Sequence, residues 1–204
     1  MSGYQIVHLD DMIKELGEDE TKSILSSFSC PLNKDVEEFL KQKAISFSRQ
    51  GIAKTQLVFT SFKGELCLIG YYTICIKYIT VPFNKRTFTS TLKRRLNKFA
   101  IYNRELKAYI MTAPLIAQLG KNFNNGYNKL ITGDELLKMA CDSISYIQEI
   151  GGGRFIYLEC EDKRPLIDFY SNNGFFNFGN RTLDRDEKDS LSGDYLIQML
   201  KYNS

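Results

Sequence analysis

The sequence has little histidine and proline: one histidine, His8, four prolines and no tryptophan in 204 residues. A Ser-His-Asp or Cys-His catalytic device and a multi-histidine metal site each need a suitably placed imidazole. A single histidine near the N-terminus disfavours these classes. The five cysteines are widely spaced and contain no C-x-x-C pair. This pattern predicts reduced thiols and no metal site.

Long apolar runs and nucleotide-binding glycine motifs are absent as well. No apolar run approaches 18 residues, and the start MSGYQIVHLDD has neither a basic n-region nor an apolar h-region. These absences predict a cytoplasmic protein without a membrane span or a secretory signal. The sequence contains neither G-x-G-x-x-G nor G-x-x-x-x-G-K-[ST]. A dinucleotide or a P-loop nucleotide is therefore not favoured as the ligand.

Charge is present, and it is unevenly distributed. The net charge of +3 is too small to imply a polyanionic partner by itself. Residues 1–30 carry six acids against two lysines, whereas 85–107 carry one acid, Glu105, against eight cations. We expect 82–105 to be a basic surface insertion with a short helix. That helix is solvated, or pairs with the acidic N-terminal segment, or contacts phosphates. The candidate phosphate ligands are Lys93, Arg94, Arg95 and Lys98.

The hydrophobic pattern predicts one α/β domain of the α+β type over 1–204. Two strands joined at Lys63-Gly64 are expected before the insertion, and a strand, helix, strand, helix and strand pair after it. Thr132-Gly-Asp-Glu135 has the spacing of a capping box, and three glycines from Gly151 end the helix that follows. A strand that enters a polar loop before a capped helix forms an anion cradle, since the first helical N–H groups are unpaired. The alternative is an ordinary surface loop.

Four segments resemble the GCN5-related N-acetyltransferases, the GNAT family, and in particular its branch of acetylating bacterial toxins. They are IGYYTICI (69–76), APLIAQLGKNFNNGYNKLITGDELLKMA (113–140), FIYLECED (155–162) and LIDFYSNNGF (166–175), in the family's order and spacing. The resemblance covers about Glu65 to Tyr202. It implies a central, mixed, mostly antiparallel sheet flanked by helices, with splayed central strands, and acetyl-CoA as the cofactor.

The resemblance also implies which residues bind acetyl-CoA. The strand before the loop pairs with the pantetheine arm, and the loop amides bind the pyrophosphate. Only the final glycine matches the family's Gln/Arg-x-x-Gly-x-Gly/Ala, because Asn128 replaces a longer side chain and Ile131 replaces a glycine. Lys163 stands where many members have an asparagine. The implied cofactor residues are Gln118, Leu119, Gly120, Asn128, Lys129, Leu130, Ile131, Thr132, Gly133 and Lys163.

Tyr170 falls on the family's catalytic tyrosine. When an amine attacks a thioester, a thiolate leaves, and a phenol with a pKa of about 10 can protonate it. The alternative is an aromatic side chain that packs at the end of a helix, as expected for Phe169 and Phe175. For the base that frees the amine, Glu159 and Glu161 share one face of their strand. A solvated strand end or proton transfer to water explains them equally well.

The acceptor is not fixed by these residues. The toxin-like branch acetylates the amine of aminoacyl-tRNA, which the basic insertion would help to hold. A small amine, a protein lysine, or a binding or regulatory module without catalysis are the alternatives. Family members are often dimers, which makes a homodimer an open expectation.

Overall fold

The computed structural model describes residues 3–83, 88–185, 187–188, 191 and 193–203. Lys85 and Arg86 of the basic segment lie outside these ranges. In the described part of the chain, no helix has the length and apolar character to cross a membrane. The elements in chain order are β1 (Gln5–His8), α1 (Leu9–Leu16), α2 (Glu18–Ser26), α3 (Lys34–Glu38), the π-helix η1 (Phe39–Lys43), α4 (Ala44–Arg49), β2 (Lys54–Phe62), β3 (Glu65–Pro82), α5 (Ser90–Phe99), β4 (Ile101–Asn103), β5 (Ala108–Lys121), the 3₁₀ segment η2 (Asn124–Lys129), α6 (Gly133–Gly151), β6 (Phe155–Glu161), α7 (Arg164–Asn172), β7 (Phe176–Thr182) and β8 (Tyr195–Tyr202).

The strands form an eight-stranded sheet in the order β1-β2-β3-β5-β6-β8-β7, with β4 paired to β5 outside this path. The pairs β1·β2, β2·β3, β4·β5, β6·β8 and β7·β8 are antiparallel. The predicted α+β class with a mostly antiparallel sheet is therefore confirmed. The predicted hairpin turn is confirmed too, since Lys63 and Gly64 join β2 to β3 with φ of 54° and 87°.

The chain divides into two compact units, which we describe separately. The first comprises Met1–Cys75, Ile116–Asp142 and Asp189–Leu191, and the second Ile76–Leu115, Ser143–Lys188 and Ser192–Ser204. The boundary falls within β3, β5 and α6, so each unit contains one part of these elements. The expectation of a single domain over 1–204 stays a prediction.

The N-terminal helices of the first unit share one apolar core with β2 and β3. Leu9, Leu25, Phe28 and Leu40 are almost fully buried in it. The Tyr71 hydroxyl donates to the carbonyl of Val36 at 2.5 Å, which joins β3 to α3. The helix α3 begins after Asn33, whose side chain caps it by accepting from the Val36 N–H at 3.2 Å. The π-helical turn that follows α3 was not predicted, because no residue type specifies it.

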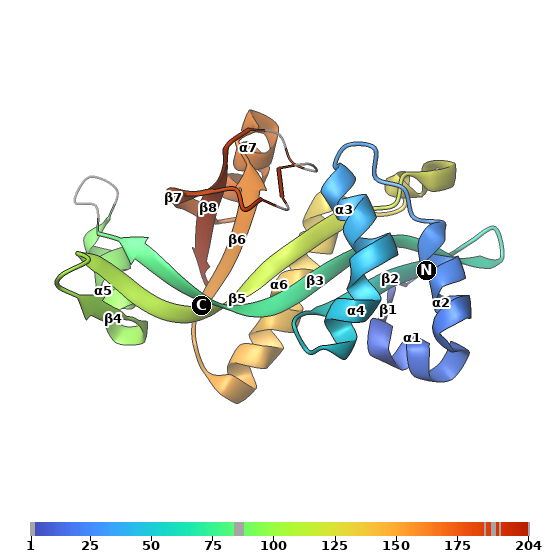
Figure 1. Cartoon of the computed structure of the whole chain (residues 1–204), viewed down its shortest axis with the longest axis horizontal. Coiled ribbons are helices and arrows are strands. Elements are labelled where there is room, and N and C mark those ends of the chain that lie inside the picture. Colours follow the sequence, from blue (N-terminus) through green and yellow to red (C-terminus); the bar gives the residue numbers. More distant parts are fainter. Residues whose placement is uncertain (1–2, 84–87, 186, 189–190, 192, 204) are drawn as a thin grey trace. The chain divides into compact units, whose positions relative to one another are not determined.

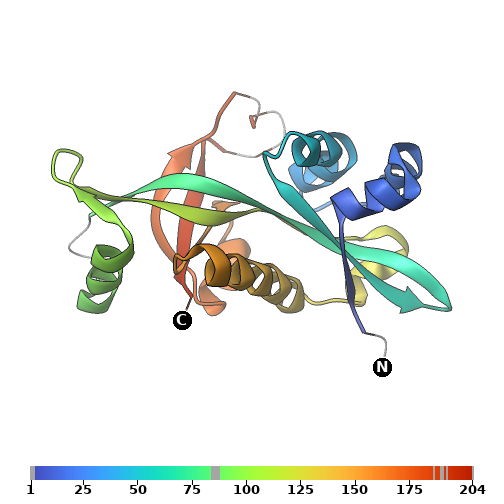
Figure 2. The ribbon, with the colours of Figure 1, turned by 90° about the horizontal axis from the view of Figure 1, so that it is seen from below.

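The second unit contains β6, β8 and β7 with the short helix α7 (Figure 1). It also contains α5, which lies beside the ends of β3 and β5 that belong to this unit (Figure 2). The predicted short basic helix is confirmed as α5, and Thr89 caps it by accepting from the Leu92 N–H at 3.1 Å. Leu92 and Leu96 are its buried residues, which explains why Lys93, Arg94 and Lys98 lie on the outer side.

Candidate active site

The end of β5 lies in the first unit, where the resemblance places the pantetheine contact. Gln118 and Leu119 are half-buried and Gly120 is buried. The Gln118 side-chain amide donates to Asp35 Oδ2 at 2.7 Å, which joins β5 to α3. A Cβ on Gly120 would overlap Val36 Cγ1 and lie 3.3 Å from Phe28 Cζ. Packing against the N-terminal helices therefore already requires a glycine at this position.

Asn122, just after β5, anchors the loop that follows, and it was not singled out in the sequence. Its side chain is fully buried; Oδ1 accepts from the N–H groups of Ser29 and Asn124, each at 3.0 Å, and Nδ2 donates to the Leu68 carbonyl at 2.8 Å. These bonds fix the start of the loop to β3 and to the segment between α2 and α3. An asparagine within KNFNNGYNK looks like any polar loop residue, so no local pattern indicates this burial.

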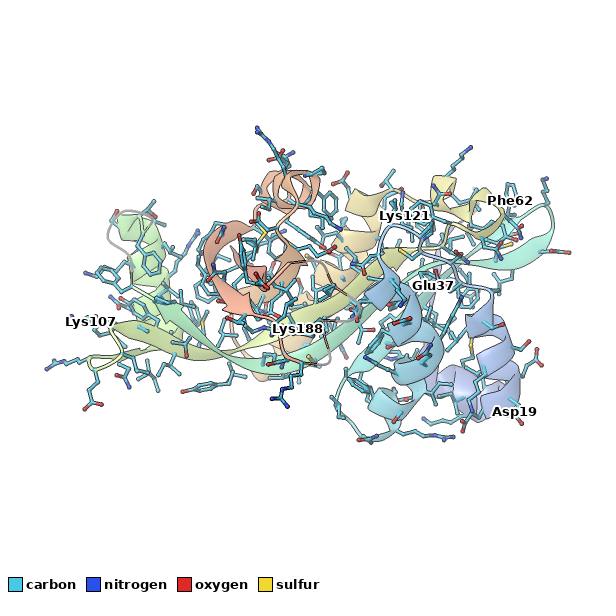
Figure 3. The ribbon with its side chains drawn as sticks, turned by 45° about the horizontal axis from the view of Figure 1, so that its top comes forward. Asp19, Glu37, Phe62, Lys107, Lys121 and Lys188 are labelled. Carbon is cyan, nitrogen blue, oxygen red and sulfur yellow. The ribbon has the colours of Figure 1, made fainter. Side chains whose placement is uncertain are left out.

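The loop itself turns tightly through η2. Asn125 and Gly126 have φ of 51° and 72°, the left-handed region that favours asparagine and glycine. Lys121 points to the same loop (Figure 3), and its ammonium donates to the Asn128 carbonyl at 3.0 Å. Lys129 is exposed. Two lysines thus lie at the loop, one of them already bound to its backbone.

The predicted capping box at the start of α6 is confirmed by a reciprocal pair of bonds. The Thr132 hydroxyl accepts from the Glu135 N–H at 3.1 Å, while the Thr132 N–H donates to Glu135 Oε2 at 2.8 Å. The bonds from the Thr132 N–H and hydroxyl hold the pKa of Glu135 below its usual value. The Tyr4 hydroxyl also contacts Glu135 and the Leu130 carbonyl, both at 3.1 Å. The Thr132 amide is therefore engaged within the protein.

The same loop retains groups that fit an anionic ligand. Ile131 is only 2% exposed, so the side chain that replaces the family's glycine fills the core instead of the loop surface. Within the described ranges, the N–H groups of Ile131 and Gly133 have no hydrogen-bond partner. Together with the exposed Lys129 they are donors of the kind that hold a pyrophosphate at a helix N-terminus.

Tyr170 lies in the second unit, near the end of α7. The helix has Pro165 in its first turn and ends at Gly174, whose φ is 83°. The Tyr170 ring packs edge-on against Phe169 and Phe175, with centroid distances of 5.0 and 5.9 Å. These contacts fix the ring, and Phe169 and Phe175 pack at the end of the helix as expected.

The Tyr170 hydroxyl is chemically available. The side chain is half-buried, and no residue of the described ranges is hydrogen-bonded to the hydroxyl. Burial raises the pKa of Tyr170 above its usual value of 10, and the Cys160 thiol adds to this shift. The phenol therefore stays protonated near neutral pH, as a general acid requires.

Glu159 projects from β6 into a network of ion pairs. Arg181 Nε lies 2.9 and 3.0 Å from the two oxygens of Glu159, and Tyr157 donates a hydrogen bond to the same carboxylate. The other guanidinium nitrogens contact Glu187 at 2.9 and 2.7 Å. Both oxygens of Glu159 thus have partners, an arrangement that favours a structural ion pair over a base.

Glu161, the second candidate base, is buried, with a side chain only 7% exposed. Its carboxylate pairs with Lys163 at 2.9 Å. This ion pair engages Lys163, which the resemblance assigns to the cofactor. The geometry tests neither Glu161 as the base nor Lys163 as a cofactor residue, and both roles stay predictions.

The basic helix α5 shares the second unit with Tyr170, and its four candidate cations differ in their surroundings. The Arg95 guanidinium carbon lies 3.9 Å from the centre of the Tyr202 ring, and the side chain is half-buried. Lys93 and Lys98 are exposed, each 5.4 Å from a phenylalanine ring centre, and Arg94 is exposed. Arg95 therefore serves packing, whereas Lys93, Arg94 and Lys98 remain accessible to solvent.

The geometry assembles the predicted residues in two groups. Residues 118–120 and 128–133 lie in the first unit, whereas Glu159, Glu161, Lys163, Tyr170 and α5 lie in the second. Across the ranges that the structure covers, no three His, Cys, Asp or Glu side chains gather where they could hold a metal ion.

Comparison with known proteins rests on structure alone, since no protein-family model and no curated protein matches the chain. A tyrosine-to-phenylalanine variant of the toxin KacT superposes with a TM-score of 0.61 over 96% of this chain and 93% of that chain, at 12% identity. A corresponding variant of the toxin AtaT gives 0.58 over 85% and 82%, at 16% identity. The chain has the fold of the GNAT toxins.

A third structure, AtaT complexed with acetyl-methionyl-tRNAfMet, gives a TM-score of 0.57 over 96% of this chain and 94% of that chain, at 15% identity. The fold expected from the four sequence segments is therefore confirmed over nearly the whole chain.

Proposed function

We propose that this protein is an acetyl-CoA-dependent N-acetyltransferase that acts on a primary amine, with Tyr170 as the general acid. The observation that carries the proposal is the Tyr170 phenol, held rigidly by Phe169 and Phe175 and free of hydrogen bonds within the described ranges. Two solved relatives of the same fold are tyrosine-to-phenylalanine variants. The combination of fold and available phenol favours acetyl transfer.

The chemistry follows from the protonation state of that phenol. Bound acetyl-CoA supplies the acetyl group as a thioester. As the amine nitrogen forms its bond to the acetyl carbon, the carbon–sulfur bond breaks, and Tyr170 gives its proton to the sulfur. The amine loses its own proton to water or to a carboxylate such as Glu161. A general acid of this kind accelerates a reaction about 10²- to 10⁴-fold, which corresponds to lowering the activation free energy by roughly 3 to 5 kcal/mol.

The cofactor would be held by the loop before α6. AtaTR has been solved bound with AcCoA, and AtaT with acetyl-CoA in the presence of an antitoxin segment. In this chain the Ile131 and Gly133 N–H groups and Lys129 supply the donors for a pyrophosphate, and the backbone at Gln118 and Leu119 would pair with the pantetheine arm. The buried Ile131 side chain supports this assignment, because it leaves the loop surface open.

For the acceptor we propose the amine of aminoacyl-tRNA. The complex of AtaT with acetyl-methionyl-tRNAfMet shows such a product on a protein of this fold. Lys93, Arg94 and Lys98 are exposed on α5, where they would contact phosphates. A small amine or a protein lysine would not need this cationic helix, so the test of the acceptor is the salt dependence of binding to charged tRNA.

The decisive experiment measures acetyl transfer from labelled acetyl-CoA to charged tRNA by the wild type and by Tyr170→Phe. We expect Tyr170→Phe to lower kcat at least tenfold while the thermal shift caused by acetyl-CoA is retained. Tyr146→Phe is the matched control, because Tyr146 is 65% exposed on α6. Unchanged turnover in Tyr170→Phe would remove Tyr170 from the mechanism.

A GNAT-fold binding module without catalysis is the second candidate. The feature that favours it is the loop, where Asn128 and Ile131 depart from the family motif and Glu135 engages the Thr132 amide. A module of this kind would show no thermal shift with acetyl-CoA at millimolar concentration, whereas the proposed enzyme is stabilised by it.

A further inference from the structure

An open depression of about 520 Å³ lies on the second unit, where β4 pairs with β5. Tyr78, Ile101, Tyr102 and Ile110 form its apolar part. Ile101 and Ile110 are cross-strand partners, so their side chains lie on the same face of the sheet. Tyr78 is 69% and Ile101 76% exposed, an unusual state for side chains of this size on a sheet.

The strand pattern shows that no described residue covers this face. From Tyr78 to Pro82 of β3, exposed and buried residues alternate: Tyr78 and Thr80 are exposed, whereas Ile79 and Val81 are buried. Tyr102, by contrast, is fixed by aromatic neighbours. Its ring centre lies 5.0 Å from that of Tyr109, whose hydroxyl donates to Asn97 Oδ1 at 2.7 Å. Tyr102 and Tyr109 are cross-strand partners, so the Tyr102 ring lies on the face opposite to Ile101 and Ile110, and Tyr78 is the accessible ring of the depression.

Polar groups close one end of the depression. Asn103, Arg104 and Glu105 line it in the turn between β4 and β5. The Asn103 side chain fixes that turn by accepting from the Leu106 N–H at 2.9 Å. Arg104 and Glu105 are exposed and offer hydrogen-bond donors and an acceptor beside the aromatic rings. Aromatic faces flanked by such groups match the flat faces and polar edges of nucleobases.

The charge around the depression indicates which partner it fits. Among the residues between 76 and 107 that the structure describes, seven are lysines or arginines and one, Glu105, is an acid. Lys107, labelled in Figure 3, lies in the turn next to Arg104, and the exposed cations of α5 belong to the same unit. An apolar face for a protein partner does not require such an excess of positive charge, whereas a nucleic acid does.

We propose that this depression binds an unpaired nucleobase of a single-stranded RNA segment. The base stacks on the Tyr78 ring, its polar edge contacts Arg104 and Glu105, and exposed cations such as Lys107 neutralise the neighbouring phosphates. The choice of RNA rests on the proposed function, in which the acceptor is carried by RNA. The site itself needs neither acetyl-CoA nor Tyr170, so it is tested by binding alone.

The test measures binding by fluorescence anisotropy of a labelled RNA, once as a single strand and once in a duplex. A strand of about 12 nucleotides is long enough to span such a site. Stacking is worth about 1–3 kcal/mol per base, so Tyr78→Ala is expected to weaken binding of the single strand about tenfold and of the duplex far less. Tyr146→Ala, at an exposed tyrosine outside the depression, is the control with unchanged affinity.

Salt dependence separates stacking from phosphate contacts. Tyr78→Ala should leave the slope of log Kd against log salt unchanged, whereas Arg94→Ala should reduce it by about one. The proposal is overturned if Tyr78→Ala binds the single strand like the wild type, or weakens the duplex equally. It is also overturned if Tyr78→Ala converts a dimer into a monomer on a sizing column, which would make the face an interface between copies. A protein that binds RNA in this way but transfers no acetyl group would contradict the proposed function only.

Discussion

The two faces of strand β6 carry tyrosines in opposite chemical situations. Alternate residues of a strand point to opposite faces, so Tyr157 and Glu159 lie on one side and Cys160 on the other. The Tyr157 hydroxyl donates to Glu159 and accepts from Gln198 Nε2 at 2.6 Å. Tyr170, whose pKa responds to Cys160, has no hydrogen-bond partner within the described ranges.

Both phenols have a raised pKa, and burial is the main cause in each case. The shift alone therefore does not distinguish a structural tyrosine from a reactive one. The difference lies in the partners: Tyr157 is part of a saturated network with Glu159 and Arg181, whereas the Tyr170 hydroxyl can still donate its proton. Availability of the hydroxyl, together with the pKa, identifies the candidate acid.

The largest contrast is expected between Tyr170→Phe and Tyr157→Phe. Loss of the general acid should lower kcat by about 10²- to 10⁴-fold in Tyr170→Phe with little change in stability. Loss of the Tyr157 hydroxyl leaves Glu159 and Gln198 each without one partner, so the free energy of unfolding should fall by about 1–3 kcal/mol while kcat changes little. Steady-state acetyl transfer and urea unfolding of both variants measure the two effects.

The comparison fails if Tyr157→Phe lowers kcat as much as Tyr170→Phe does. In that case the Tyr157–Glu159 pair would belong to the reaction, and Glu159 would regain its place as candidate base.

A second contrast concerns the ion pairs on the Tyr157 side. Arg181→Ala removes the cation shared by Glu159 and Glu187, whose side chains are 15% and 26% exposed. Removing one partner of a buried ion pair costs about 3–5 kcal/mol, and partial exposure here reduces the expected loss to roughly 2–3 kcal/mol in the free energy of unfolding. Arg181→Lys keeps the charge but loses the bidentate geometry. Its free energy of unfolding should therefore lie between those of the wild type and Arg181→Ala.

Arg181→Ala should leave acetyl-CoA binding intact, as measured by its thermal shift. A variant that is as stable as the wild type would show that the network contributes nothing to folding.

Much of the fold was predictable from local patterns. The capping box at Thr132 is encoded in adjacent residues, and the helix that follows it was placed correctly. The second helix expected after the insertion is present as α7, with Tyr170 near its end. Here local sequence and tertiary structure agree, so periodicity and capping suffice.

The parts that were not predictable depend on partners distant in the chain. Glu159 looked like a solvated strand end, because its partner Arg181 is 22 residues away. The burial of Asn122 depends on Ser29 and Leu68, from two other segments of the sequence. No periodicity encodes such pairings, and a single sequence contains no other record of them.

A third test varies pH instead of sequence. Burial acts to raise the pKa of Glu187, but its bonds with Arg181 outweigh this and hold that pKa below its usual 4.5. A lowered carboxyl pKa in the folded state stabilises the protein above about pH 4.5, and this stabilisation is lost as pH falls through the folded-state value. The difference in stability between wild type and Arg181→Ala should therefore shrink on acidification. Urea unfolding from pH 7 to pH 3 measures it, and a constant difference would contradict the assignment.

The smallest expected effect comes from two glycines that end helices with nearly the same backbone. Gly174 ends α7 with φ of 83°, and Gly152 follows α6 with φ of 81°. Alanine at either position enters the left-handed region, which costs about 1 kcal/mol. Gly174→Ala should also lower kcat a fewfold, because the adjacent Phe175 N–H donates to the Tyr170 carbonyl at 3.0 Å and fixes the end of the helix.

Gly152→Ala is the matched control for this last effect. A Cβ there would meet nothing within 4 Å, so its only consequence should be the loss of stability. Urea unfolding should show similar losses for both variants, and acetyl transfer should show a reduced kcat for Gly174→Ala alone. If both variants kept full kcat, the position of Tyr170 would not depend on the end of α7, and the rigid support proposed for the phenol would reduce to its ring contacts with Phe169 and Phe175.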